Sequence, residues 1–185
     1  EKLNNSNGWP TDATQAASPL ETYKILSSGQ GTGWCEERQV VLYLFANAVG
    51  VKTRMVDIAG RFGPLQLPLH YFCEIWIPEE ASWCFVDPSP GIAGVRNSEG
   101  RYMNTLELKR LRDLGALNPC HVRLYDKKSG EIVTQTWEEL ELGIFPYQGD
   151  IVIAYKFGYG NCKSFPKLRN FIKYTTLVIS PFPVP

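Results

Sequence analysis

The sequence predicts an α+β fold in which one central helix packs on a mostly antiparallel β-sheet. A helical pattern comes first, at residues 35–48, and short runs of β-branched and aromatic residues follow it. Turn residues separate these runs, as they do in sheets whose strands are joined by hairpins. The chain has 185 residues, which is about the length of one domain.

The composition is that of a globular chain without an excess of either charge. Apolar residues make up 44% of the chain, and 19 basic residues balance 19 acidic ones. This balance argues against whole-surface binding to nucleic acid or to an anionic membrane, although it leaves a local patch open. No apolar run reaches the ~20 residues of a membrane span. Because the chain starts at Glu1 rather than Met, we expect a processed product or a fragment, and the compartment stays open.

Two helices separated by a glycine-rich loop are expected in the first part of the chain. Residues 1–20 are polar and are interpreted as an N-terminal arm, and residues 21–27 as a short helix. The loop runs from Ser27 to Gly33. Residues 35–48 contain no Gly or Pro, and their apolar residues recur at helical spacing, so this helix is long and largely enclosed. Gly50 is expected to end it.

Three strands should follow this helix. Residues 51–58, 70–77 and 82–86 are rich in β-branched and aromatic side chains. A loop over residues 60–68, which contains Pro and Gly, is expected between the first two strands. A turn at residues 78–81 closes a hairpin between the second and the third.

The second half of the chain predicts one further helix and several strands. The segment after Pro88 is expected to be irregular to about Gly100, and Asn104 should cap a helix from Thr105 to Leu114. The other expected elements are a hairpin over residues 122–135 that turns at 128–130, a short helical stretch opened by Thr136 and Glu139, and strands at residues 150–157 and 174–179.

Cys35 is the candidate nucleophile. It lies at the predicted start of the long helix, directly after the glycine-rich loop. Free N–H groups and the helix dipole favour an anion at this position, and the thiolate is the nucleophilic form of cysteine. The N–H of Cys35 would face an oxyanion formed beside the sulfur. On its own, a cysteine at a helix start is more often a small buried side chain, so the interpretation depends on its partners.

His70 and Asp87 are the expected partners of Cys35. His70 enters one predicted strand and Asp87 ends the next. If the two residues lie directly opposite each other, both side chains project from one face, and the carboxylate can orient the imidazole. The same register places Cys73 opposite Cys84 on the other face, where we expect two reduced thiols rather than a disulfide.

These residues stand in a context that resembles the transglutaminase-like superfamily. The matching features are a Gly-x-Cys helix start, a Val-Gly-Val-x-x-Arg step into a strand, a His-x-x-x-Glu strand and a Trp-x-x-x-Asp-Pro strand end. They cover about residues 21–91, less than half of the chain. The resemblance implies a papain-like fold whose central helix bears the nucleophile, with Cys35, His70 and Asp87 as the catalytic triad.

The function expected from this resemblance is hydrolysis of an amide bond in a protein or peptide through a thioester. The superfamily contains proteases, amidases, protein crosslinkers and non-catalytic binding modules. A transglutaminase, which passes the acyl group to an amine, shares the first half-reaction, and an aromatic tunnel would favour it. A non-catalytic interaction module would show a distorted triad, with His70 displaced from its partners.

Two residues are candidates for the second oxyanion donor. Superfamily members often use a tryptophan N–H upstream of the cysteine, whereas papain-like proteases use a glutamine. Trp9 and Gln30 both precede Cys35, and the sequence leaves the choice open. Trp34, directly before the cysteine, is expected to form a wall of the cleft.

No metal or other cofactor is expected. The chain has two histidines and no Cys-x-x-Cys pair, which argues against a zinc site, and it has no calcium loop of the EF-hand type. The five cysteines are an odd number, so at least one thiol has no partner within the chain.

The chain is therefore divided into an arm, residues 1–20, and one transglutaminase-like catalytic domain, residues 21–185. Residues 21–91 carry the motifs. Residues 92–185 are expected to complete the sheet or the cleft.

Overall fold

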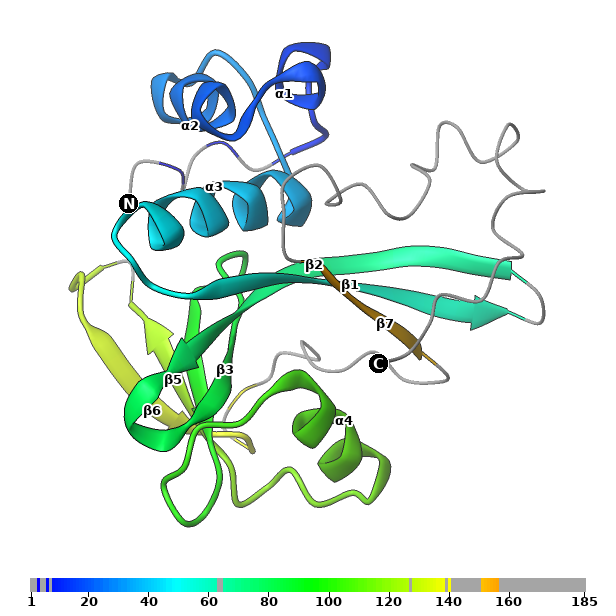
Figure 1. Ribbon diagram of the computed structural model, residues 1–185, viewed down its shortest axis with the longest axis vertical. Helices are drawn as coiled ribbons and strands as arrows, with labels where there is room; N and C mark the ends of the chain where they lie inside the picture. Colours follow the sequence, from blue (N-terminus) through cyan, green and yellow to red (C-terminus); the bar gives the residue numbers. More distant parts are fainter. Residues whose placement is uncertain are drawn as a thin grey trace.

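The computed structural model has a mixed α+β architecture with two antiparallel sheets and a few helices, which confirms the predicted class (Figure 1). It describes residues 3, 6, 8–62, 65–126, 128–138, 140 and 151–156. No helix in this part of the chain is long and apolar enough to cross a membrane.

The described residues form four α-helices, and the long central one matches its prediction at both ends. Helix α3 spans Cys35–Ala48, and Gly50 follows it with a positive φ of 81°. The short helix expected at residues 21–27 is α2. The other bounds are α1 Asp12–Ala16, α2 Pro19–Ser28 and α4 Thr105–Asp113.

The N-terminal arm is more regular than expected. Helix α1 lies within the arm, and the last two residues of the arm, 19 and 20, are the first two of α2. Polar side chains cap both helices. Thr11 accepts a hydrogen bond from the N–H of Thr14. Ser18 and Glu21 form a capping box at the start of α2. In Figure 1 both helices lie above α3, on the side away from the sheets.

The first sheet contains four strands in the order β3-β2-β1-β7, and every neighbouring pair is antiparallel. Its strands are β1 Thr53–Phe62, β2 Leu65–Ile77, β3 Ser82–Val86 and β7 Ile151–Lys156. Strand β7 pairs with β1, so residues 151–156 from the last part of the chain belong to this sheet. The predicted turn at residues 78–81 is a single 3-10 turn, Pro78–Glu80.

The expected loop over residues 60–68 is wrong. Strands β1 and β2 continue through most of this segment as one long hairpin, in which Phe62 pairs with Leu65. The pairing shifts between Ile58, which faces His70, and Ala59, which faces Pro68, so a β-bulge lies just before His70. The proline is accommodated at this irregular position, which is where sheets tolerate it.

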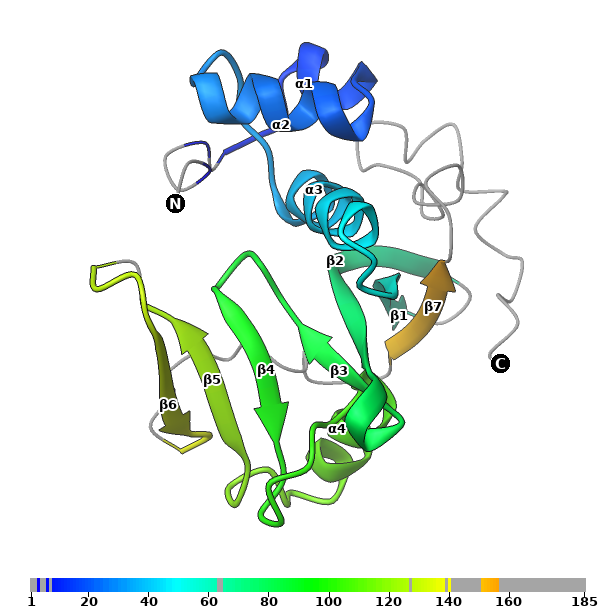
Figure 2. The same ribbon diagram turned by 60° about the vertical axis from the view of Figure 1, so that its left-hand side comes forward.

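A second sheet contains three antiparallel strands in the order β4-β5-β6 (Figure 2). Its strands are β4 Ile92–Arg96, β5 His121–Tyr125 and β6 Ile132–Thr136. The predicted hairpin over residues 122–135 is thus confirmed. The segment that forms β4 was expected to be irregular, but it is a strand of the second sheet. It follows β3 through a tight turn, at which an isolated bridge between Asp87 and Ile92 has two backbone hydrogen bonds of 3.0 and 2.8 Å.

The remaining predictions for the second half differ in their outcomes. Asn104 caps α4 and accepts a hydrogen bond from the N–H of Glu107, as expected. The strand at residues 150–157 is β7. The prediction that a helical stretch opens at Thr136 is wrong for the described residues, because Thr136 ends β6 and a turn follows it. Glu139 and the strand at residues 174–179 lie outside the described residues.

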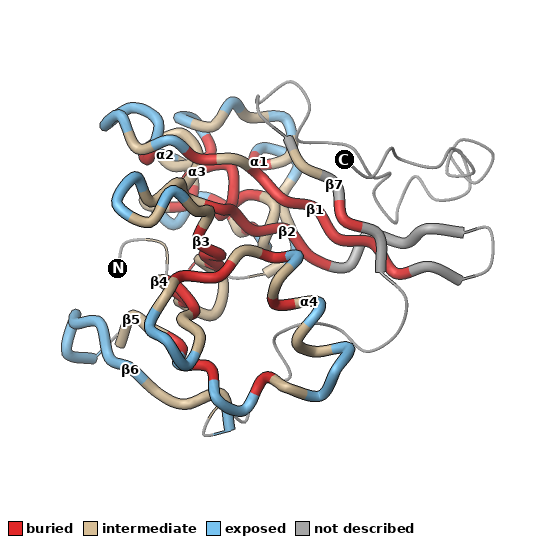
Figure 3. Tube along the Cα trace, turned by 60° about the horizontal axis from the view of Figure 1, so that its bottom comes forward, coloured by how far each residue is buried: buried red, intermediate tan, exposed pale blue. Residues whose placement is uncertain are grey.

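The main hydrophobic core lies between the two sheets and α4, and a smaller one lies under α3. Phe72, Phe85 and Leu108 are fully buried in the main core. Val40 of α3 packs with Met55 and Cys73 on the opposite face of the first sheet. The buried residues follow β1, β2 and β3 through the middle of the molecule (Figure 3).

The side chain of Gln39 connects α3 to the first sheet by hydrogen bonds. This side chain is fully buried, and its amide donates hydrogen bonds to the carbonyl oxygens of Val56 on β1 and Phe72 on β2, at 3.1 and 2.6 Å. Because Gln39 lies one turn after Cys35, these bonds also determine where the start of α3 sits over the sheet.

Replacing Gln39 with alanine is expected to lower the free energy of unfolding by about 2–4 kcal/mol. The change leaves a cavity and removes two hydrogen bonds from buried carbonyl groups. Urea denaturation followed by circular dichroism measures the loss. Asn47→Ala is the control, because the Asn47 side chain is exposed and bonds only within its own helix. An equal loss in the two variants would contradict the role of Gln39.

Candidate active site

Cys35 is the first residue of α3 and is partly exposed. The first hydrogen bond within the helix is donated by the N–H of Arg38 to the carbonyl of Trp34, at 3.2 Å. The N–H of Cys35 therefore comes before the helical ladder begins and is directed out of the helix end. The sulfur sits where the helix dipole favours negative charge.

His70 and Asp87 lie against each other beside this helix end. The Nε2 atom of His70 is 2.5 Å from Oδ2 of Asp87. Asp87 is fully buried, and His70 is 9% exposed. The other carboxylate oxygen, Oδ1, accepts the N–H of Ser89 at 2.9 Å. The turn between β3 and β4 therefore positions the carboxylate beside the imidazole.

His70 also forms a side-chain hydrogen bond with Cys35. Since Nε2 faces Asp87, Nδ1 is the ring nitrogen that remains for the sulfur. Burial acts to lower the pKa of His70, but the hydrogen bonds to Asp87 and Cys35, and the charges of both, raise it to about 10. The ring is therefore an imidazolium at neutral pH, and the three side chains form one continuous chain of hydrogen bonds.

The register of β2 and β3, the strands that carry the contact between His70 and Asp87, differs from the predicted one. Strands β2 and β3 pair Cys73 with Val86 and Ile75 with Cys84, so the alignment is shifted by two residues. A shift of two preserves the face to which each side chain points. His70 and Asp87 therefore meet diagonally rather than directly opposite each other.

The expectation that Cys73 faces Cys84 is wrong for the same reason. Both thiols are buried and free, as is that of Cys120. Cys73 packs under α3, whereas Cys84 packs near Tyr102. Burial raises the pKa of both Cys73 and Cys84, so neither is an activated thiol.

The pKa of His70 predicts how stability depends on pH. Its folded value, about 10, is above the ordinary value of 6.5, so the protonated ring stabilises the fold fully below pH 6.5. This contribution is lost as the pH rises towards 10. In a Cys35→Ser background, where no thiol can exchange a proton with the ring, we expect the free energy of unfolding to fall above pH 6.5 by up to about 1.4 kcal/mol per pH unit.

Urea denaturation between pH 6.5 and 8.5 measures this slope before most thiols and phenols titrate. The variant His70→Asn, made in the same background, is expected to show a flatter profile over the same range. Equal slopes in the two proteins would mean that His70 does not gain a proton on folding.

The N-terminal arm places Trp9 against Trp34, the residue that precedes the candidate nucleophile. Gly33 donates its N–H to the carbonyl of Ser6 at 2.9 Å, and Gly8 donates to the carbonyl of Gly33 at 3.3 Å. The rings of Trp9 and Trp34 are consequently 4.1 Å apart between centroids. Both are exposed, Trp9 by 67% and Trp34 by 39%. Gln30, in contrast, is exposed in the turn after α2.

Sequence reasoning missed two side chains that shape this helix end. Glu37 is buried, and its carboxylate accepts the N–H of Trp34 at 2.9 Å, which orients the residue before Cys35. A side chain on Gly33 would lie 2.9 Å from Cβ of Glu37, so only glycine fits there. Tyr71 is the second; burial raises its pKa, and the charges of nearby acids and of Cys35 raise it further. The sequence signal that could have pointed to Tyr71 is its position directly after His70.

Among the described residues, no group of three or more His, Cys, Asp or Glu side chains is arranged to hold a metal ion. No family model matches the sequence, and a search of curated proteins finds no match.

Proposed function

We propose that this chain is a cysteine-dependent amide hydrolase of the transglutaminase-like, papain-like type. The observation that carries the proposal is the chain of hydrogen bonds from Asp87 through His70 to Cys35, with the sulfur at the start of α3. A nucleophile, a base and an orienting carboxylate in this order are the parts that covalent acyl transfer requires.

In the first half-reaction the thiolate of Cys35 attacks the amide carbonyl carbon. The electrons of the C–O double bond move to the carbonyl oxygen, which becomes an oxyanion. The imidazolium of His70 then donates its proton to the leaving nitrogen, the C–N bond breaks, and a thioester remains. The high pKa of His70, about 10, supports this role, because the proton is on the ring at neutral pH.

In the second half-reaction the neutral imidazole accepts a proton from water, and the resulting hydroxide attacks the thioester. Collapse of the tetrahedral intermediate releases the carboxylic acid and the thiolate, and the proton remains on His70. Asp87 stabilises the imidazolium in both steps. The N–H of Cys35 is the first oxyanion donor, and Trp9 is favoured over Gln30 as the second because it lies beside Trp34.

A second candidate function is protein-glutamine transglutaminase activity. The exposed aromatic pair Trp9 and Trp34, adjacent to the nucleophile, supports it. Aromatic walls exclude water and favour an amine as the acyl acceptor. The intact contact of His70 with both partners argues against a non-catalytic module, for which a displaced histidine was expected.

The two activities are separated by one pair of assays on the wild-type protein. Fluorescein-labelled casein reports hydrolysis, and dimethylated casein with monodansylcadaverine reports transfer to an amine. Release of soluble fluorescence without dansyl incorporation supports the hydrolase. Incorporation at glutamine side chains, located by mass spectrometry, would instead assign the transglutaminase. If Cys35 acquires no acyl group from either substrate in acid-quenched samples, neither casein is a substrate and the hydrolase proposal for proteins fails.

A further inference from the structure

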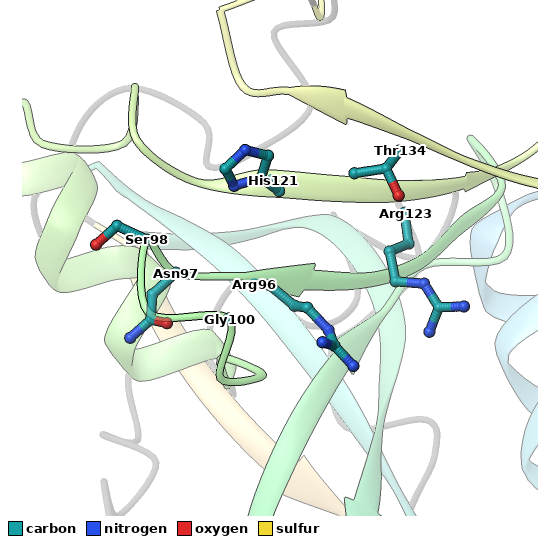
Figure 4. A pocket seen from close by; sticks show the side chains of 7 residues that line it. All are labelled: Arg96, Asn97, Ser98, Gly100, His121, Arg123 and Thr134. Atoms are coloured by element: carbon teal, nitrogen blue, oxygen red, sulfur yellow. The ribbon is translucent and has the colours of Figure 1, made fainter.

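A cavity of about 520 Å³ lies on the second sheet and shares no residue with the candidate active site (Figure 4). Its volume is within the range of small-molecule sites. The polar side chains around it come from three strands and the turn after β4. They are Arg96, Asn97, Ser98, His121, Arg123 and Thr134.

The sheet register explains why these side chains face the same way. Arg96 pairs with His121 across β4 and β5, and Arg123 pairs with Thr134 across β5 and β6. Directly paired residues project from one face of a sheet. The alternate position, Val122, points to the other face and is fully buried in the main core. The polar face is thus the outer face of the second sheet.

Tyr102 holds both arginines in place. The guanidinium of Arg96 lies 4.2 Å from the centre of the Tyr102 ring, and Arg123 donates a hydrogen bond to the Tyr102 hydroxyl. The ring packs on Gly94, where an added Cβ would be 2.8 Å from a ring carbon. The glycine therefore makes room for the tyrosine, and the tyrosine orders the two guanidinium groups before any ligand arrives.

The positive charges at this cavity are not neutralised within the part of the chain that the structure describes. Neither Arg96 nor Arg123 forms an ion pair with a carboxylate there. A side-chain hydrogen bond with Tyr102 is the main cause that raises the pKa of Arg96, and the charge of Glu80, whose carboxylate accepts the N–H of Tyr102 at 2.8 Å, adds to it. The Nε atom of Arg96 is buried without a hydrogen-bond partner. An unsatisfied buried donor next to a cationic cavity indicates a missing acceptor.

We propose that this cavity binds the phosphate group of a small phosphomonoester. Two guanidinium groups match the charge of −1.5 to −2 that such a group carries at neutral pH. The Thr134 hydroxyl on β6 supplies a further donor, and three donor groups suit a tetrahedral oxyanion better than a planar carboxylate. The cavity exceeds the size of phosphate alone, so the organic part of the ligand occupies the remaining volume.

NMR titration of the ¹⁵N-labelled protein tests the proposal, with inorganic phosphate and O-phosphoserine as probes and acetate and serine as controls at equal ionic strength. We expect shifts at the amides of β4, β5 and β6 with both phosphates and none of similar size with either control. Equal shifts with acetate, or phosphate shifts scattered over the surface, would overturn the proposal.

Two variants make the test specific. Thr134→Glu places a carboxylate in the cavity at an exposed strand position and leaves the Tyr102 packing intact, whereas Arg96→Gln removes one charge. Each is expected to weaken phosphate binding about tenfold or more. Arg110→Gln, which removes an exposed arginine from α4, should bind as the wild type does. Unchanged binding in a folded Thr134→Glu variant would contradict the site.

Discussion

Replacing Cys35 with serine is expected to lower the rate of amide hydrolysis by about 10³-fold or more, with little change in stability. Serine is close in size, and Cys35 is partly exposed, so packing is preserved. A serine hydroxyl is a weaker nucleophile than a cysteine thiol at neutral pH, so the attack on the amide is slowed. The measurement is the initial rate of casein hydrolysis, with folding checked by circular dichroism.

Cys120→Ala serves as the matched control for this prediction. It removes a buried thiol that contacts Met103 and takes no part in the hydrogen bonds of His70 and Asp87, so it should lose stability while retaining hydrolysis. If Cys35→Ser kept the wild-type rate while Cys120→Ala lost it, the nucleophile would be assigned to the wrong cysteine.

The largest loss of stability is expected from Glu74→Ala. The Glu74 side chain is fully buried on β2, where Oε2 accepts the Nε–H of Arg54 at 2.7 Å and Oε1 accepts the N–H of Thr105 at 2.7 Å. Glu74 thus joins the first sheet to the start of α4. Alanine leaves a largely buried guanidinium without its counter-ion, which costs about 3–5 kcal/mol.

Urea denaturation at pH 7 measures this loss as a decrease in the free energy of unfolding. Asp113→Ala breaks the exposed ion pair of Asp113 with Lys109 on α4 and should change stability little, because solvent screens that pair. Losses of similar size in the two variants would show that Glu74 does not connect the elements as described.

The sequence predicted the elements whose signals are local. Helix α3 has periodic apolar residues between a glycine-rich loop and Gly50, and both of its ends were predicted correctly. The cap of α4 at Asn104 is likewise a local signal. His70 and Asp87 were placed on one face because alternation along a strand determines the face of a side chain. Alternation does not determine the pairing partner, so the register was off by two residues.

The sequence was less informative where tertiary contacts override local preference. Residues 60–68 contain Pro and Gly, yet pairing between β1 and β2 carries both strands through the segment around a bulge. Strand β4 was missed because Gly94 weakens a strand pattern, and only the packing of Tyr102 explains it. The function of Gln39, which joins α3 to two strands, depends on a helix-to-sheet distance that no spacing in the sequence encodes.

The central claim is that His70 activates Cys35, and the most direct test is the alkylation rate of each cysteine by iodoacetamide at pH 6, resolved by mass spectrometry. We expect Cys35 to react fastest in the native protein and to slow by about tenfold or more in His70→Ala, because an adjacent histidine activates a cysteine nucleophile. A Cys35 that reacts no faster than a thiol of the unfolded chain, or at the same rate with and without His70, would contradict the account.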